Sequence, residues 1–199
     1  MADHIDFYFE FSSPYGYFAS TQIEALAAEF QRQVRWHPIL LGPMFQATGS
    51  APLVDVPVKG QYSLHDMKRT AKLFNIPFKQ PDPFPIGTVS AARAVLYAQQ
   101  KNTNQATELA KRLYHAYFSE GQNIGKAEVV LAVAEQAGLS ATELQAGIAQ
   151  DSIKALLKQE VNDAMARGVF GSPFMIVDDE PFWGFDRFEH IRHWLRQNG

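Results

Sequence analysis

The amino-acid sequence predicts a mixed α/β fold in which a small sheet is interrupted by a block of helices. Three observations support this prediction. Every second residue of 5–11 is apolar, apolar residues recur at helical spacing in several segments of 61–150, and two short apolar runs follow at 174–177 and 181–184. A period of two is typical of strands, and a spacing of three to four residues is typical of helices. The expected order is therefore β-α-β, a helical block, then α-β-β-α.

The first β-α-β unit is predicted from its start signals. Ser13 followed by Pro14 favours a helix start directly after the strand at 5–11, with Ser at the N-cap and Pro in the first turn. Helical spacing then continues to Phe30, and 34–41 reads as a second strand. A strand, one long helix and another strand most simply give parallel strands.

The middle of the chain is predicted to be a long loop followed by helices. Glycine and proline break the pattern from Gly42 to Gly60, with Lys59 just before a helix expected from about Gln61. Helical patterns then cover 61–75, 88–101, 103–120, 126–137, a capped start at 140–143, and 152–167. We therefore expect residues 1–60 and 151–199 to form one domain and 61–150 to form an inserted helical domain.

The composition excludes several classes of function. The chain has 199 residues, a formal net charge of -3 and no block of Lys or Arg, which argues against a nucleic-acid partner. It has no cysteine, so it cannot carry a disulfide framework, a thiolate metal site or a cysteine nucleophile of its own. No signal-like or membrane-spanning run is found, and a cytoplasmic protein is expected. His190 and His193 lack further ligands nearby in sequence, so no metal site is predicted.

Three short stretches could carry chemistry. Ser13 lies where a strand meets a helix start, a place that suits an anion, although a plain helix cap is the default for a Ser-Pro pair. Ser172-Pro173 leads directly into a strand; a trans bond is the default, and a cis bond would turn the Ser172 backbone toward an extended peptide-like ligand. Asp186 could N-cap the final helix or hold a ligand ammonium group.

Together with the long loop, these stretches resemble one family. The chain resembles the 2-hydroxychromene-2-carboxylate isomerases and the related kappa-class glutathione transferases, in the DsbA-like branch of the thioredoxin superfamily. The likeness is carried by Asp6 to Tyr15, the loop 48–59, Phe84-Pro85, the stretch 168–173, and Phe182 to Arg187. It implies a thioredoxin-like βαβ…αββα domain interrupted by an all-helical insertion domain, with glutathione as cofactor.

The resemblance also implies roles for individual residues. Ser13, rather than Ser12, would contact the glutathione sulfur as the catalytic residue, and Ser172 before a cis Pro173 would pair with the cysteinyl backbone. The remaining cofactor-binding residues would be Ser50, Lys59, Trp183, Gly184, Phe185 and Asp186. The candidate substrate-pocket residues are Tyr15, Phe45 and Phe84, together with Tyr17, and core packing is an equal alternative for each. Ser50 and Gly87 stand where the family often has Asn, which bears on the choice of second substrate.

The function expected from this resemblance is isomerisation of a small aromatic acid in aromatic catabolism, with a bound glutathione thiolate as nucleophile. A homodimer is expected on the same basis. One alternative is a kappa-like transferase or peroxidase that consumes glutathione. Another is a non-catalytic module that binds glutathione or a peptide. A dithiol oxidoreductase is excluded because the chain lacks cysteine, unless it acts only through bound thiols.

Overall fold

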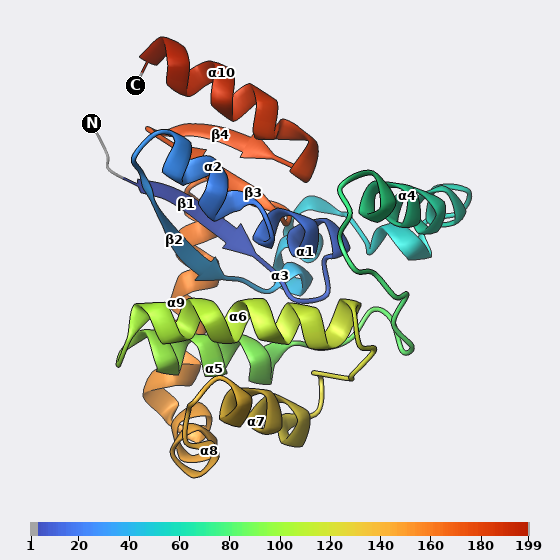
Figure 1. Ribbon diagram of the computed structural model, residues 1–199. Helices are drawn as coiled ribbons and strands as arrows, with labels where there is room; N and C mark the ends of the chain where they lie inside the picture. Colours follow the sequence, from blue (N-terminus) through green and yellow to red (C-terminus); the bar gives the residue numbers. More distant parts are fainter. Residues whose placement is uncertain (1–3, 199) are drawn as a thin grey trace.

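The computed structural model, which describes residues 4–198, has one four-stranded sheet within that range (Figure 1). The strands are β1 (His4–Phe9), β2 (Gln33–Pro38), β3 (Phe174–Val177) and β4 (Glu180–Trp183), in the order β2-β1-β3-β4. β1 pairs with β2 in parallel and with β3 antiparallel, and β4 lies antiparallel to β3. The predicted β-α-β unit and the terminal pair of strands are therefore confirmed.

The crossover from β1 to β2 consists of two helices, α1 (Pro14–Ser20) and α2 (Ile23–Glu29). The prediction of one long helix was wrong at Ser20 and Thr21. Both hydroxyls donate to main-chain carbonyl oxygens one turn earlier, at 2.7 Å. Such local bonds compete with the regular helix ladder, and the chain turns there before α2 begins.

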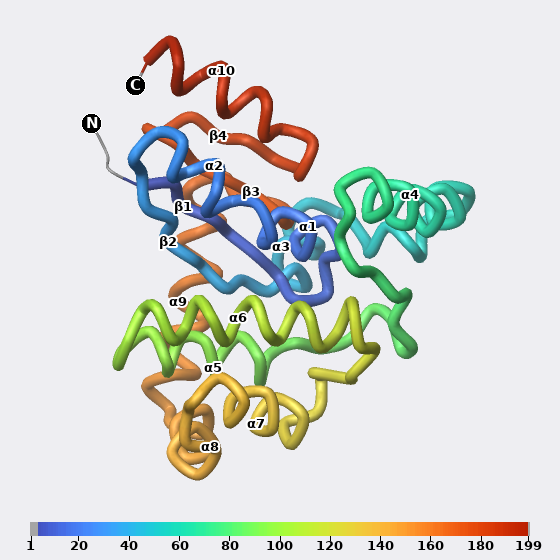
Figure 2. The backbone as a smooth tube through the Cα atoms, viewed as in Figure 1, coloured from blue at the N-terminus to red at the C-terminus, as the bar shows by residue number. Residues whose placement is uncertain are grey.

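The alternation along β1 separates two cores, because both faces of the sheet are covered. Ile5, Phe7 and Phe9 are fully buried on the face that packs against α1, α2 and the C-terminal helix α10 (Phe188–Asn198). On the other face Tyr8 is buried together with residues of α9 (Asp151–Ala166) and the segment that follows it. The backbone trace follows α9 behind the sheet (Figure 2).

Residues 89–149 form helices that lie below the sheet in Figure 1 and are built around two long helices that pack side by side, whereas the helix at 59–73 lies to the right of the sheet. The helices between β2 and α9 are α3 (Leu41–Thr48), the 3₁₀ turn η1 (Leu53–Asp55), α4 (Lys59–Leu73), α5 (Val89–Gln99), α6 (Thr103–Phe118), α7 (Ala127–Gln136) and α8 (Ala141–Ala149). α6 also contacts α1, and α9 contacts both α5 and β2. The proposed division into 1–60 with 151–199, and 61–150, stays a prediction.

The prediction of a loop from Gly42 to Gly60 was wrong in two places. Residues 41–48 form α3, since Pro43 lies in its first turn, where a missing N–H costs nothing. Gly49 then ends the helix with a φ of 68°. α4 begins at Lys59 rather than near Gln61. Within residues 4–198, none of these helices is both long and apolar enough to cross a lipid bilayer.

Candidate functional site

Ser13 lies in the turn between β1 and α1, and its side chain caps that helix. The Ser13 Oγ accepts a hydrogen bond from the Gly16 N–H at 3.0 Å, as the Ser-Pro signal predicted. The same hydroxyl donates to the carbonyl oxygen of Ser172 at 2.8 Å. Ser13 is 6% exposed. Two residues that are 159 positions apart in sequence are thus joined directly at the end of the sheet.

The Ser172–Pro173 peptide bond is cis, as the resemblance implied. It lies between α9 and β3, and it is fixed from two sides. The Ser172 Oγ accepts a bond from the Glu10 N–H at 2.9 Å, and the Pro173 carbonyl accepts one from the Gly184 N–H at 3.0 Å. The Ser172 backbone is therefore held between the end of β1 and the end of β4.

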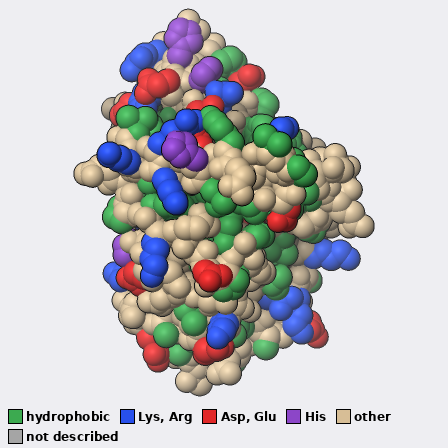
Figure 3. All heavy atoms as spheres, turned by 90° about the vertical axis from the view of Figure 1, so that its right-hand side faces the viewer, with side chains coloured by type: hydrophobic (Ala, Val, Ile, Leu, Met, Phe, Trp, Pro, Cys, Tyr) green, Lys and Arg blue, Asp and Glu red, His purple; other side chains and the backbone are tan. Residues whose placement is uncertain are grey.

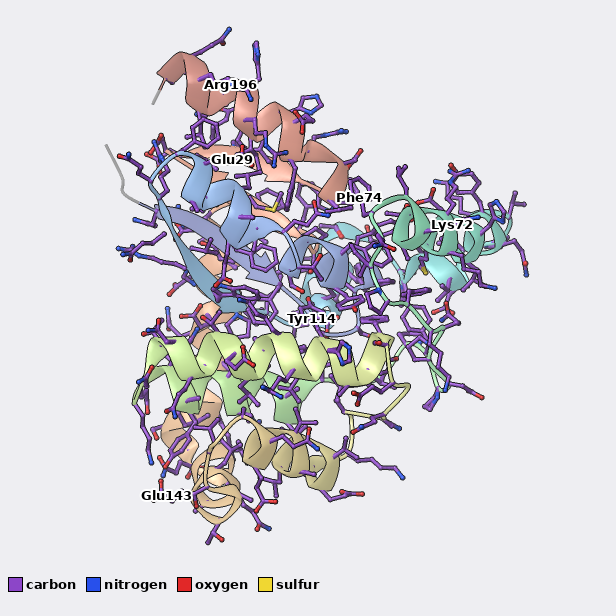
Figure 4. All side chains as sticks on the ribbon, viewed as in Figure 1. Glu29, Lys72, Phe74, Tyr114, Glu143 and Arg196 are labelled. Carbon is purple, nitrogen blue, oxygen red and sulfur yellow. The ribbon has the colours of Figure 1, made fainter. Side chains whose placement is uncertain are left out.

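Gly16 allows α6 to approach the site closely. A Cβ at Gly16 would lie 2.5 Å from the Tyr114 hydroxyl oxygen and 3.0 Å from the Ser172 Oγ. Tyr114 projects from α6 toward the sheet layer (Figure 4), and its hydroxyl donates to the Glu10 carbonyl oxygen at 2.9 Å. Helix α6 thus contacts the Ser13 turn directly.

Glu10 is a site residue that the sequence reasoning missed. Its carboxylate is buried and accepts bonds from the Ser12 N–H at 2.8 Å and from the Thr88 hydroxyl. Burial raises the pKa of Glu10 to about 7, although both hydrogen bonds act in the opposite direction. The sequence offered only a weak signal, a carboxylate three residues before Ser13, because the alternation assigns Glu10 to the same side of the predicted strand as Asp6 and Tyr8.

An exposed aromatic pair borders the cis-proline loop. Trp183 is 55% exposed and Phe170 is 41% exposed, and their ring centroids lie 4.9 Å apart. A Cβ at Gly171 would lie 2.5 Å from the Trp183 Nε1, so this glycine lets the indole lie against the loop. Trp183 was predicted as a site residue, whereas Phe170 was not. In the space-filling view of the face that carries α4, hydrophobic side chains gather across the middle (Figure 3).

The prediction that Asp186 caps the final helix was wrong. Residues 185–187 form a 3₁₀ turn, η2 (Phe185–Arg187), and α10 begins only at Phe188. The exposed Asp186 carboxylate pairs with Arg187 at 2.9 Å. Phe185 is buried against aromatic rings of the core, so only its backbone could meet a ligand. Gly184 has a φ of 112°, and a Cβ there would collide with the Asp186 carboxylate at 2.4 Å.

The predicted substrate-pocket residues occupy different environments. Tyr15 is half-buried and donates to Asp66 of α4, and burial is the main cause that raises its pKa. Phe84 is half-buried next to the ring of Phe118. Phe45 is half-buried in α3. Tyr17 is 3% exposed and its hydroxyl donates to the Pro77 carbonyl, so Tyr17 belongs to the core.

Ser50 and Lys59 flank the segment between α3 and α4. Both are exposed, Ser50 directly after Gly49 and Lys59 at the first position of α4. Within residues 4–198, neither side chain makes a hydrogen bond to Ser13 or Ser172. Their assignment to the cofactor site therefore stays a prediction.

A second polar cluster lies on the face of the sheet that α9 covers. The Asp6 carboxylate accepts bonds from Arg167 at 2.6 Å and lies 3.2 Å from the His37 ring. Burial acts to raise the pKa of Asp6, but the bonds to His37 and Arg167 outweigh it and hold that pKa well below its ordinary range. This cluster joins β1, β2 and the end of α9, and it is separate from Ser13.

Comparison with known proteins places this arrangement in context. The chain is 29% identical over 197 residues to a 2-hydroxychromene-2-carboxylate isomerase of Sphingobium xenophagum, covering 98% of this chain and 99% of that protein. It is 27% identical over 206 residues to glutathione S-transferase kappa 1 of Caenorhabditis elegans, covering 97% and 91%. A solved structure of a 2-hydroxychromene-2-carboxylate isomerase matches with a TM-score of 0.88 at 25% identity, covering 98% of this chain and 95% of that one.

The family match covers the same span as the fold. Residues 4–196 match the DSBA-like thioredoxin domain, from the first residue of β1 into the last turn of α10. The mixed sheet, the helices inserted between β2 and β3, and the cis-proline before β3 all lie within that match. This chain therefore belongs to the DsbA-like thioredoxin family, where it is similar to 2-hydroxychromene-2-carboxylate isomerases and kappa-class glutathione transferases.

Proposed function

We propose that this protein is a glutathione-dependent isomerase of a small aromatic acid of the 2-hydroxychromene-2-carboxylate type. The observation that carries the proposal is the hydrogen bond from the Ser13 hydroxyl to the Ser172 carbonyl in a chain without cysteine. A hydroxyl donor and a backbone acceptor lie side by side there, and both could bond to a cysteinyl unit supplied by glutathione. The similarity to isomerases and glutathione transferases agrees with that chemistry.

The residues present fit a peptide thiol. The Ser13 hydroxyl has one proton, which now goes to the Ser172 carbonyl oxygen, so a thiolate would receive it only by displacing that bond. The peptide N–H of the cysteinyl unit could then take over the vacated Ser172 carbonyl. The hydrogen bond that binding breaks is thereby replaced by one bond from each of its two groups to the ligand, and no polar group is left without a partner.

Ser13 would activate the thiol by hydrogen bonding. A bond to a charged group contributes about 1.5–3 kcal/mol. If that bond forms only with the thiolate, it lowers the thiol pKa by about one to two from its usual value of roughly 8.5. When bound, glutathione would supply a nucleophilic thiolate that adds to the substrate and is then released, so it would not be consumed.

The second substrate would lie against the aromatic side chains around the cis-proline loop. Phe170 and Trp183 present exposed rings at its edge. Tyr15 and Phe84 are only half-buried, so each retains some surface that a planar ligand could contact. As the resemblance implies, we include in the proposal a cytoplasmic homodimer that acts in aromatic catabolism. Sedimentation of the purified protein tests the dimer.

The test compares turnover of the hydroxychromene carboxylate with and without glutathione. We expect activity only with glutathione, and a constant concentration of free thiol during turnover. Ser13→Ala should lower the activity by about 10- to 100-fold, the loss of one charge-assisted bond. Ser20→Ala is the matched control, because Ser20 is also a buried serine of α1 that bonds to a carbonyl. Equal rates with and without glutathione would contradict the proposal.

A kappa-like transferase or peroxidase is the second candidate, favoured by the similarity to glutathione S-transferase kappa 1. The same assay separates the two, because a transferase consumes one thiol per turnover of an electrophile. If no substrate turns over and Ser13→Ala still binds glutathione, the protein is instead a binding module.

A further inference from the structure

Glu10 is the buried ionisable group closest in sequence to Ser13, and the proposed chemistry does not use it. It follows the last residue of β1 directly and is 4% exposed. Buried carboxylates are rare unless they are paired with a cation. Within residues 4–198, no lysine, arginine or histidine forms an ion pair with Glu10, whose carboxylate bonds only to uncharged donors.

The side chain of Glu10 joins the site turn to the helical part of the molecule. Its Oε2 accepts the Ser12 N–H at 2.8 Å, inside the turn that presents Ser13. Its Oε1 accepts the hydroxyl of Thr88, the buried N-cap residue of α5. One carboxylate therefore connects the first turn of α5 to the turn before α1.

The backbone of Glu10 makes three further bonds at the same place. Its N–H donates to the Ser172 Oγ at 2.9 Å. Its carbonyl accepts the Ser13 N–H at 2.9 Å and the Tyr114 hydroxyl at 2.9 Å. Glu10 thus bonds to the Ser13 turn, to the cis-proline loop and to α6. Movement of Glu10 would therefore move both the Ser13 turn and the cis-proline loop.

The titratable groups that face Glu10 are phenols of α6. Burial is the main cause that raises the pKa of Tyr114 and of Tyr117, and the Glu10 charge adds to it, so both rings stay neutral where carboxyl groups titrate. α5 contributes Thr88, the cis-proline loop contributes Ser172, and neither titrates. Among residues 4–198, Glu10 is therefore the group that can change the charge at this place near neutral pH.

We propose that Glu10 is the positioning residue of the Ser13 site, and that it transmits the protonation state of its carboxyl group to the Ser12 amide and the Ser13 turn. The inference about the turn concerns the free protein. Its effect on a bound thiol rests on the proposed function.

The two protonation states differ in what the donors can do. The ionised carboxylate accepts from both Ser12 and Thr88. A protonated carboxyl has one O–H donor, and the Ser12 N–H cannot become an acceptor, whereas the Thr88 hydroxyl can. The proton therefore resides on the oxygen that faces Thr88, whose hydroxyl reverses its direction. The Ser12 N–H is then left with a neutral acceptor and a weaker bond.

The test follows the amide resonances of Ser12 and Ser13 by NMR while the pH of the glutathione-free protein is varied. In the wild type we expect both amides to titrate with a midpoint near neutrality. Glu10→Gln should abolish this titration, because glutamine keeps the shape of the side chain without the ionisation. Glu128→Gln, at an exposed position of α7, is the matched control and should leave it unchanged.

Thr88→Val is a second variant, and it should shift the titration midpoint in a direction that a purely structural role of Glu10 would not give. It removes the hydroxyl that stabilises the ionised carboxyl, so the midpoint should move to higher pH. This variant also decides the question if Glu10→Gln fails to fold. A Ser12 titration that persists in Glu10→Gln, or a midpoint that does not move in Thr88→Val, would overturn the inference.

Glutathione binding gives a separate readout. An ionised Glu10 disfavours a second negative charge nearby, so Glu10→Gln should bind glutathione several-fold more tightly than wild type above the midpoint and equally well below it. If wild type binds glutathione but the ratio does not change with pH, Glu10 does not act on the thiol, and the inference is wrong in that part. If wild type does not bind glutathione at all, the proposed function fails, and the amide titration still decides the role of Glu10.

Discussion

Replacing Glu10 with glutamine should make the protein more stable at alkaline pH, although it removes a buried, hydrogen-bonded side chain. Glu10 is 4% exposed and has no cation beside it in the part of the chain that the structure describes. Ionising it in the folded state is therefore unfavourable. Glutamine occupies nearly the same volume and offers a carbonyl oxygen to the Ser12 N–H, but it has no charge to bury.

The size of the effect follows from the two pKa values. Burial raises the pKa of Glu10 from 4.5 to about 7, a difference that corresponds to roughly 3 kcal/mol. The sign follows from linkage. Because the pKa of Glu10 is raised in the folded state, the contribution of this residue to the unfolding free energy is fully present below about pH 4.5 and is lost as the pH rises through about 7. Most of the loss, roughly 2.5 kcal/mol, falls between about pH 5 and pH 8.

The assay is urea unfolding of wild type, Glu10→Gln and Glu128→Gln at several pH values. The difference in unfolding free energy between Glu10→Gln and wild type should grow by roughly 2.5 kcal/mol over that range. Burial acts to lower the pKa of His37, but its bonds to Asp6 and Glu160 outweigh burial and raise that pKa. His37 therefore also makes the unfolding free energy fall with rising pH, and it does so equally in each variant. If the unfolding free energies of wild type and Glu10→Gln change with pH by the same amount, the reasoning is refuted.

Three further predictions concern other contacts. Ser13→Ala should lower the unfolding free energy by about 1 kcal/mol in urea unfolding, because the N-cap of α1 is lost. Gly16→Ala should cost about 1–3 kcal/mol from overpacking against the Tyr114 hydroxyl at 2.5 Å, and in thermal unfolding Tyr114→Phe should recover part of it, whereas strictly additive losses would contradict this contact. Arg167→Gln should cost about 1.5–3 kcal/mol at neutral pH, because Asp6 loses a charged partner. This loss should shrink as acid titration protonates Asp6, whose low pKa makes its stabilisation fade with falling pH; a loss that does not depend on pH would count against the pair.

The site was predicted in part. The Ser-Pro signal correctly gave a capped helix start at Ser13, because a cap bonds to an amide three residues away and depends on neighbours in sequence. The cis bond at Ser172–Pro173 came from the resemblance alone, since the residues by themselves favoured trans. Glu10 was missed because its position in an alternating strand resembled that of any polar residue facing solvent.

Asp186 shows how a local sequence signal can predict the wrong local structure. An Asp before a helical pattern is typical of an N-cap, but Phe185 is pulled into the core against Phe18 and Phe74. The chain tightens into a 3₁₀ turn, and α10 starts two residues after Asp186. Packing of one aromatic ring outweighed a local preference.

The sequence by itself determined the order of the four strands along the chain, the absence of any protein thiol, and the cap at Ser13. These are consequences of local periodicity, composition and bonds between near neighbours. Only the tertiary structure decided that Ser13 meets Ser172 and that Glu10 is buried between them and α6. The reason is that β3 pairs with β1 across more than 160 residues, and α6 packs on α1. Long-range packing, rather than local pattern, sets the partners and the charge state of the side chains at this site.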